Sequence, residues 1–271
     1  MTPTLTVALP SFGDAPAGGW RGLIDLAVAA EEAGVDRVVV SDHVILGPNV
    51  DQYPWGRFPV APDGAWLEPL TVLTAIAAAT SRVRLATGIL IAPLRPAAVL
   101  AKTVATLDQL SGGRVDLGVG TGWQREEYDA VGLDFDRRGQ LLTETITSCR
   151  AFWEGRVPDV YCEPRPVQAR LPIWFSGTLT PRNIRRIVEL GDGWLPITGA
   201  TVDDVRVGIE QLRTALTAAG RDPDALQVQG SARNFDDIPA LAAAGVTTIN
   251  VFLRLTTGTL PELVDSFAKY L

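Results

Sequence analysis

Short runs of apolar, often β-branched residues alternate along the chain with longer stretches whose apolar positions recur at helical spacing. The runs predict buried strands and the longer stretches predict amphipathic helices that cover them. The expected strand-then-helix units are residues 5–9 with 20–33, 37–40 with 68–80, 83–91 with 97–110, 115–119 with 141–153, 172–175 with 181–190, 193–197 with 205–218, 226–229 with 238–244, and 246–253 with 260–270.

This regular alternation predicts the α/β class. Eight such units in 271 residues fit a single (β/α)8 TIM barrel that spans residues 1–271, and a doubly wound parallel sheet is the main competitor. Helix boundaries are marked by Thr180-Pro181 at one start and by Gly34 and Gly245 after alanine-rich helices. No composition break suggests a linker between domains.

Composition and charge narrow the class of partner. Lys and Arg number 24 against 31 Asp and Glu, a net charge of −7, which argues against nucleic acid or an anionic membrane as a partner. The chain shows no signal-type start and no apolar run of membrane-spanning length, so a cytoplasmic location is expected. Cys149 and Cys162 form no CxxC pair and lie far from the one histidine, which predicts two unlinked thiols and no metal site.

The connection over residues 42–67 is long, rich in proline and aromatic residues, and without periodicity; it contains Trp55 and Trp66. Loops of this length in a compact domain are usually functional or disordered. In a barrel it would rise from the carboxyl ends of the strands, where active sites are built. Its aromatic side chains would either cover a ligand ring or pack on one another as a surface loop.

His43 is the only histidine and follows Asp42 at the end of the second expected strand. Histidine is the side chain best suited to moving a proton near neutral pH, so His43 is the candidate acid/base. Asp42 is a candidate partner, although neighbours on an extended chain point to opposite sides, and Asp42 would then cap the loop or bond to backbone.

In three further segments, glycine would let a ligand or a neighbouring strand come close to the backbone. The first follows the fourth strand and is Gly118-Val119-Gly120-Thr121-Gly122-Trp123. It fits either a tight turn or contact with an anion or a flat ring. It is not a dinucleotide-binding fingerprint, since Trp123 occupies the place of the third glycine. Ser176-Gly177-Thr178 runs into a helix start that would attract an anion, with plain capping as the alternative. Thr87-Gly88-Ile89 places a glycine inside a strand, which indicates a bulge or a close backbone approach.

The order and spacing of these motifs match a known family over nearly the whole chain, most strongly over residues 101–123 and least after residue 201. The matching segments are residues 30–36, 42–43, 67–70, 85–89, 101–114, 118–123, 172–174 and 191–194, with Glu127, Arg138, Glu144 and Trp153 at similar spacing. Together they resemble the bacterial luciferase-like oxidoreductases.

The resemblance implies a barrel whose mouth binds a flavin or its deaza analogue. Asp-His after the second strand and Gly-Trp after the fourth look like the actinobacterial group that uses coenzyme F-420, an 8-hydroxy-5-deazaflavin that carries hydride. An FMN-dependent monooxygenase and a non-catalytic flavin-binding protein are the alternatives, and a homodimer is also implied. By this resemblance, the residues that contact the cofactor are Thr87, Gly88 and Ile89, with a non-proline cis peptide at Gly88-Ile89, then Gly120, Thr121 and Gly122, and Ser176, Gly177 and Thr178.

The chain departs from the family's sugar-phosphate dehydrogenases at two positions. By resemblance, those enzymes have an acidic residue directly after the glycine that corresponds to Gly122. They also have a tryptophan four residues after the histidine that corresponds to His43. Here these positions hold Trp123 and Gly47. A more apolar or aromatic small-molecule substrate is therefore expected, in a pocket formed by Trp55, Trp66, Trp123 and Glu127.

Overall fold

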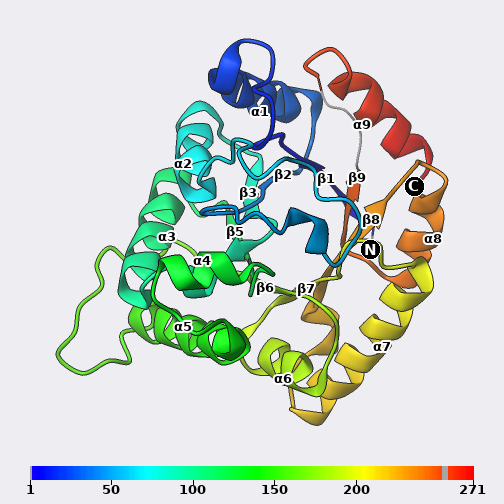
Figure 1. Cartoon of the computed structure of the whole chain (residues 1–271). Helices are drawn as coiled ribbons and strands as arrows, with labels where there is room; N and C mark the ends of the chain where they lie inside the picture. The colour runs from blue at the N-terminus through cyan, green and yellow to red at the C-terminus, as the bar shows by residue number, and fades with distance from the viewer. Residues whose placement is uncertain (1, 252–255) are drawn as a thin grey trace.

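The strands of the computed structural model, which describes residues 2–251 and 256–271, form one parallel sheet that closes on itself (Figure 1). Closure comes from the pairing of β1 with both β2 and β9 and of β5 with β3, β4 and β6. The strands are β1 (Thr4–Ala8), β2 (Arg37–Val40), β3 (Arg84–Thr87), β4 (Leu90–Ile91), β5 (Val115–Gly120), β6 (Ile173–Ser176), β7 (Gly193–Leu195), β8 (Gln227–Ala232) and β9 (Thr248–Val251).

β3 and β4 are two parts of one barrel strand, so the barrel has the eight strands that the sequence predicts. Both parts pair with β5, through Leu85 opposite Val115 and Leu90 opposite Val119. Between them the Gly88–Ile89 peptide is cis. The continuous strand expected over residues 83–91 is therefore corrected to two short strands, and the bulge expected at Gly88 is confirmed.

Helices surround the barrel on its outside (Figure 1). They are α1 (Gly22–Ala33), α2 (Pro69–Ala79), α3 (Ala97–Ser111), α4 (Arg125–Ala130), α5 (Arg138–Trp153), α6 (Pro181–Leu190), α7 (Val202–Ala218), α8 (Asp237–Ala244) and α9 (Leu260–Lys269). Short 3-10 turns lie at Gly19–Arg21, Val50–Gln52, Ala92–Leu94, Phe135–Arg137 and Pro223–Ala225. In the described part of the chain, no helix is long and apolar enough to cross a membrane.

The predicted helix boundaries are largely confirmed. The Thr180 side chain accepts the N–H of Asn183 at the start of α6, and Gly34 and Gly245 end their helices in the left-handed conformation. α7 begins earlier than the sequence pattern suggests because Thr201 and Asp204 form a reciprocal capping box there. The last expected strand reaches residues 252 and 253, which lie outside the described residues.

The barrel interior is filled by side chains, as is usual for this architecture. Every residue of β2, β5 and β9 is buried. Near the amino ends of the strands, Arg37 pairs with Asp116 at 2.8 Å and its guanidinium lies 4.4 Å from the ring centroid of Trp174. This closed floor leaves the carboxyl ends of the strands as the place for a site.

The long connection between β2 and α2 spans that mouth. It bonds to the segment after β1 through the Leu67 N–H and the Ser11 carbonyl, 2.9 Å apart, and its Tyr53 side chain lies near Thr198 beyond β7. In Figure 1 the segment runs across the end of the barrel before it returns to α2.

Candidate functional site

His43 lies buried at the mouth, 8% exposed, at the end of β2. Its Nδ1 is 3.2 Å from Oε2 of Glu127, and Oε1 of the same carboxylate accepts the Val44 N–H at 2.9 Å. An ionised carboxylate can only accept hydrogen bonds, so this contact places a proton on Nδ1. Nε2 is then the imidazole nitrogen that can accept a proton.

Glu127 does not occupy the substrate pocket expected for it. It lies on α4, 1% exposed, and it is absent from the lining of the cavity at the mouth. The short helix α4, which the sequence pattern did not predict, turns this side chain back toward β2. Glu127 therefore contacts His43 and not the cavity.

The Asp42 side chain does not pair with His43 and points toward β4 instead. Its carboxylate accepts the Ile91 N–H at 2.8 Å and two N–H groups of Arg95 at 2.6 and 3.0 Å. Arg95 also donates to Glu68, which caps the start of α2. The structure thus favours the alternative in which Asp42 bonds to backbone, and gives it a role in positioning the strand ends.

Three aromatic rings enclose the His43 imidazole edge-on. The ring centroids of Phe58, Trp66 and Trp123 lie 5.4, 4.6 and 6.1 Å from that of His43, at interplanar angles near 80°. Tyr53 joins them through contacts with Phe58 and Trp123. We call Tyr53, Phe58, Trp66 and Trp123 the aromatic shell. The long connection therefore covers the histidine and does not merely pack on itself.

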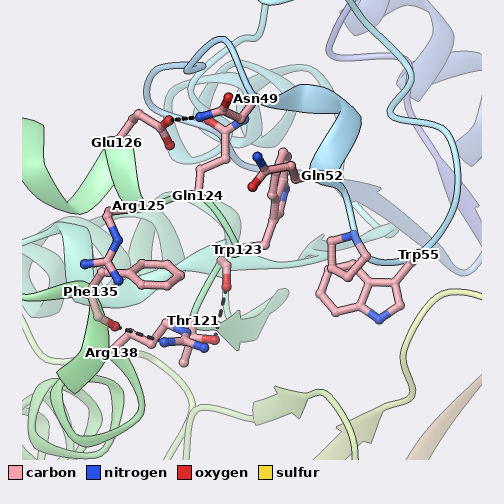
Figure 2. A pocket seen from close by; sticks show the side chains of 12 residues that line it. Asn49, Gln52, Trp55, Thr121, Trp123, Gln124, Arg125, Glu126, Phe135 and Arg138 are labelled. Carbon is pink, nitrogen blue, oxygen red and sulfur yellow. Dashed lines mark hydrogen bonds between the residues drawn. The ribbon is translucent and has the colours of Figure 1, made fainter.

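A cavity of about 560 Å³ lies beside this shell, between the long connection and the segment that follows β5 (Figure 2). One side is apolar, with Pro54, Trp55 and Trp123. On the other side Arg125 and Arg138 flank the ring of Phe135, their guanidinium carbons 4.8 and 4.1 Å from its centroid. The cavity thus combines an aromatic end with a cationic end.

The glycine run at the end of β5 permits close packing and also reaches the cavity. A Cβ on Gly120 or Gly122 would lie 3.0 Å from the side chains of Ile89 and Ile91, so these glycines allow β5 to pack closely on the bulged strand. Thr121 and Gly122 also line the cavity. Thr87 instead donates its hydroxyl to the Gly118 carbonyl at 2.6 Å, inside the barrel.

Ser176, Gly177 and Thr178 lie at the end of β6 and do not line that cavity. The Gly177 N–H donates to the Leu195 carbonyl at 3.1 Å, so it is not free to bind an anion. The hydroxyls of Ser176 and Thr178 make no hydrogen bond within residues 2–251 and 256–271. These two hydroxyls, next to the start of α6, are the groups left for an anion.

Sequence reasoning missed Gln124, Arg125 and Phe135, and it noted Arg138 only for its spacing. Their place in the sequence could have indicated them, because these residues follow the carboxyl end of β5. The two cysteines behave as expected, because both are free. Burial, together with the neighbouring Cys162, raises the pKa of Cys149 to about 12, although Arg150 opposes this shift.

Comparison with known proteins identifies a matching family and similar relatives. The family model described as luciferase-like monooxygenase matches residues 4–233. An uncharacterised protein of Mycobacterium tuberculosis (strain ATCC 25618 / H37Rv) is 36% identical over 218 residues, which is 74% of this chain and 77% of that protein.

Solved structures share the fold over its full length. The monooxygenase RslO1 from Streptomyces bottropensis has a TM-score of 0.76 at 20% identity, covering 99% of this chain and 98% of that one. An F-420-dependent secondary alcohol dehydrogenase in complex with an F-420–acetone adduct has a TM-score of 0.75 at 17% identity, covering 100% and 98%.

Proposed function

The chain belongs to the luciferase-like monooxygenase family, and from this premise we propose that it is a coenzyme F-420-dependent oxidoreductase. It would transfer a hydride between the deazaflavin and a small carbonyl compound, alcohol or activated alkene. Family members are oxidoreductases and monooxygenases, which supports an enzyme in the coarse sense. The F-420 assignment is supported by the solved dehydrogenase with its F-420–acetone adduct and by the Asp42-His43 and Gly122-Trp123 pattern.

The observation that carries the proposal is the bond between His43 Nδ1 and Glu127 at the barrel mouth. The bound deazaflavin supplies or accepts the hydride. When a hydride reaches a carbonyl carbon, the carbonyl oxygen must also gain a proton, and in the reverse direction the alcohol must lose one. We infer that His43 Nε2 gives or takes that proton, because Glu127 binds the opposite nitrogen.

The residues present fit an anionic, ring-bearing cofactor. The cavity volume lies in the usual range for small-molecule sites. Arg138 and Arg125 supply positive charge to its wall, where an anionic group of the cofactor would bind. Thr121 and Gly122 would contact the ring system from the wall that follows β5.

The aromatic shell contributes by excluding water. Burial of His43 among three rings lowers the local dielectric and keeps solvent from competing for the proton on Nε2. Asp42 and Arg95 fix the strand ends that carry the histidine. These residues position the reacting groups and do not themselves exchange protons.

Equilibrium titrations of the purified protein, followed by fluorescence quenching, test the cofactor. We expect micromolar binding of F-420 and much weaker binding of FMN. A preference for FMN, together with oxygen consumption with reduced FMN, would favour the alternative, an FMN-dependent monooxygenase. Binding of neither would overturn the cofactor assignment.

A substitution at His43 tests the proton transfer separately. His43→Ala is expected to abolish turnover while the F-420 dissociation constant stays within a few fold of the wild-type value. Normal turnover in this variant would contradict the role of His43. Cofactor binding without turnover of any carbonyl or alcohol by the wild-type protein would favour a non-catalytic carrier.

A further inference from the structure

We propose that the substrate is an uncharged compound that carries an aryl ring next to its reacting carbonyl or alcohol carbon. The ring would bind against the aromatic shell, with the oxygen toward His43 Nε2. This inference rests on the proposed function, because it assigns the reacting oxygen to His43. It adds the substrate class, which family membership leaves open.

The first support is the composition of the walls around His43. Phe58 and Trp66 approach the imidazole from the long connection, and Trp123 approaches it from β5. Pro54 and Trp55 extend the same apolar surface into the cavity. Aromatic surfaces favour a flat ring, which they contact by offset stacking or edge-to-face packing.

The second support is the charge balance at this end of the cavity. The charged side chains next to His43 are already paired, Asp42 with Arg95 and Glu127 with His43 and the Val44 N–H. Arg125 and Arg138 lie at the other end, around Phe135. A substrate with a phosphate or carboxylate would lack a counter-charge beside His43, and burying it there would be costly.

The third support is a pair of buried donors that lack acceptors. Trp123 Nε1 and Gln124 Nε2 have no hydrogen-bond partner within the described ranges, and both residues line the cavity. Buried N–H groups are ordinarily paired. A neutral ligand oxygen, such as a carbonyl or an ether, would satisfy such a donor.

The orientation of Gln124 depends on Gly47. The Gly47 N–H donates to Gln124 Oε1 at 2.8 Å, which leaves the amide nitrogen as the free end. A Cβ at Gly47 would lie 2.5 Å from Cδ of Glu126, so a larger residue here would require the Glu126 side chain to move. The two departures noted in the sequence, Gly47 and Trp123, thus shape the same wall.

Calorimetric titration with three probes tests the substrate class, both with cofactor-free protein and with protein saturated with F-420. Acetophenone has the ring and the carbonyl, acetone has only the carbonyl, and benzoate has the ring with a negative charge. We expect acetophenone to bind at least about tenfold more tightly than acetone, as burial of a phenyl ring implies. Benzoate is expected to bind more weakly than acetophenone.

Variants locate the binding site. Trp123→Leu should weaken acetophenone about tenfold and leave acetone unchanged, and Phe58→Leu provides a second variant should Trp123→Leu fail to fold. Tyr161→Leu is the matched control, because this ring is 83% exposed on the connection between α5 and β6. The control should bind acetophenone as the wild type does.

The possible outcomes separate the two proposals. F-420 binding without a preference for acetophenone over acetone would overturn the aryl substrate and leave the proposed function standing. A preference for acetophenone in cofactor-free protein that binds neither F-420 nor FMN would support the aryl site and overturn the function. Tighter binding of benzoate than of acetophenone would overturn the uncharged substrate class.

Discussion

Glu127 supports His43 from behind, with its Oε2 3.2 Å from Nδ1 of the imidazole and its Oε1 2.9 Å from the Val44 N–H. The carboxylate therefore binds both the ring and the backbone next to it. Two bonds from one carboxylate fix the orientation of the ring and leave Nε2 without a contact to Glu127. In the proposed function, Glu127 is a positioning residue that sets which nitrogen of His43 is free for proton transfer.

Replacing Glu127 with glutamine tests this relationship. The amide keeps the shape but offers one acceptor oxygen instead of two, so it cannot hold the imidazole and the Val44 N–H as the carboxylate does. We expect kcat to fall about tenfold or more, the pH profile of kcat to move, and the F-420 dissociation constant to stay within a few fold. Glu144→Gln, on the exposed side of α5, is the control. An unchanged pH profile would contradict the positioning role.

Arg95 provides a second prediction, this time on stability. Arg95→Met would leave the Asp42 carboxylate buried without its ion-pair partner. Removing one partner of a buried pair costs about 3–5 kcal/mol, and urea denaturation measures this loss. Asp42→Asn in the Arg95→Met background should recover part of it. Arg206→Met removes only exposed pairs with Asp203 and Glu210 and should change the free energy of unfolding by less than about 1 kcal/mol. If Arg95→Met changed the free energy of unfolding by a similarly small amount, the Asp42–Arg95 ion pair would not be important for stability.

The fold was predictable because its signals are local. Apolar runs and helical spacing identify the barrel units, and the glycine at position 88 marks the bulge. The sequence pattern did not predict α4, because Arg125–Ala130 is short and mostly polar and so has no helical spacing of apolar residues. Without α4, nothing in the sequence indicates that Glu127 returns to His43.

The partners of the site residues were less predictable, since they depend on tertiary contacts. The composition of residues 42–67 indicated a functional loop, but not that Tyr53 would reach Thr198 or that Phe58 and Trp66 would enclose the histidine. Likewise, Asp42 was adjacent to His43 in sequence, and its bonds go to Ile91 and Arg95 instead.

Gly88 and Val39 form a close contact that predicts an energetic coupling. A Cβ at Gly88 would lie 2.5 Å from Val39 Cγ2, so Gly88→Ala should lower the free energy of unfolding by about 1–3 kcal/mol through overpacking. Val39→Ala in that background should restore part of the loss, and a double-mutant cycle measures the coupling. Gly258→Ala, where a Cβ would meet open space, should be nearly neutral. Strict additivity of Gly88→Ala and Val39→Ala would contradict the clash.

Glu31 predicts a dependence of stability on pH. Its carboxylate accepts the backbone N–H groups of Ser81, Arg82 and Val83 at 2.5–3.1 Å. Burial opposes ionisation, but these bonds outweigh it and lower the pKa of Glu31 below the ordinary value of 4.5. A group with a lowered folded-state pKa stabilises the protein above its unfolded pKa, and this contribution is lost as the pH falls through the folded pKa.

Glu31→Ala should therefore lower the free energy of unfolding by about 1–2 kcal/mol at neutral pH, where the ionised carboxylate accepts all these bonds. The difference from the wild type should shrink as the pH falls below 4.5, because the wild-type carboxylate then takes up a proton and loses acceptor strength. Glu32→Ala, at the exposed neighbouring position, should have little effect at either pH. Urea denaturation at neutral and acidic pH measures both variants, and a Glu31→Ala difference that does not change with pH would show that packing and not charge accounts for the loss.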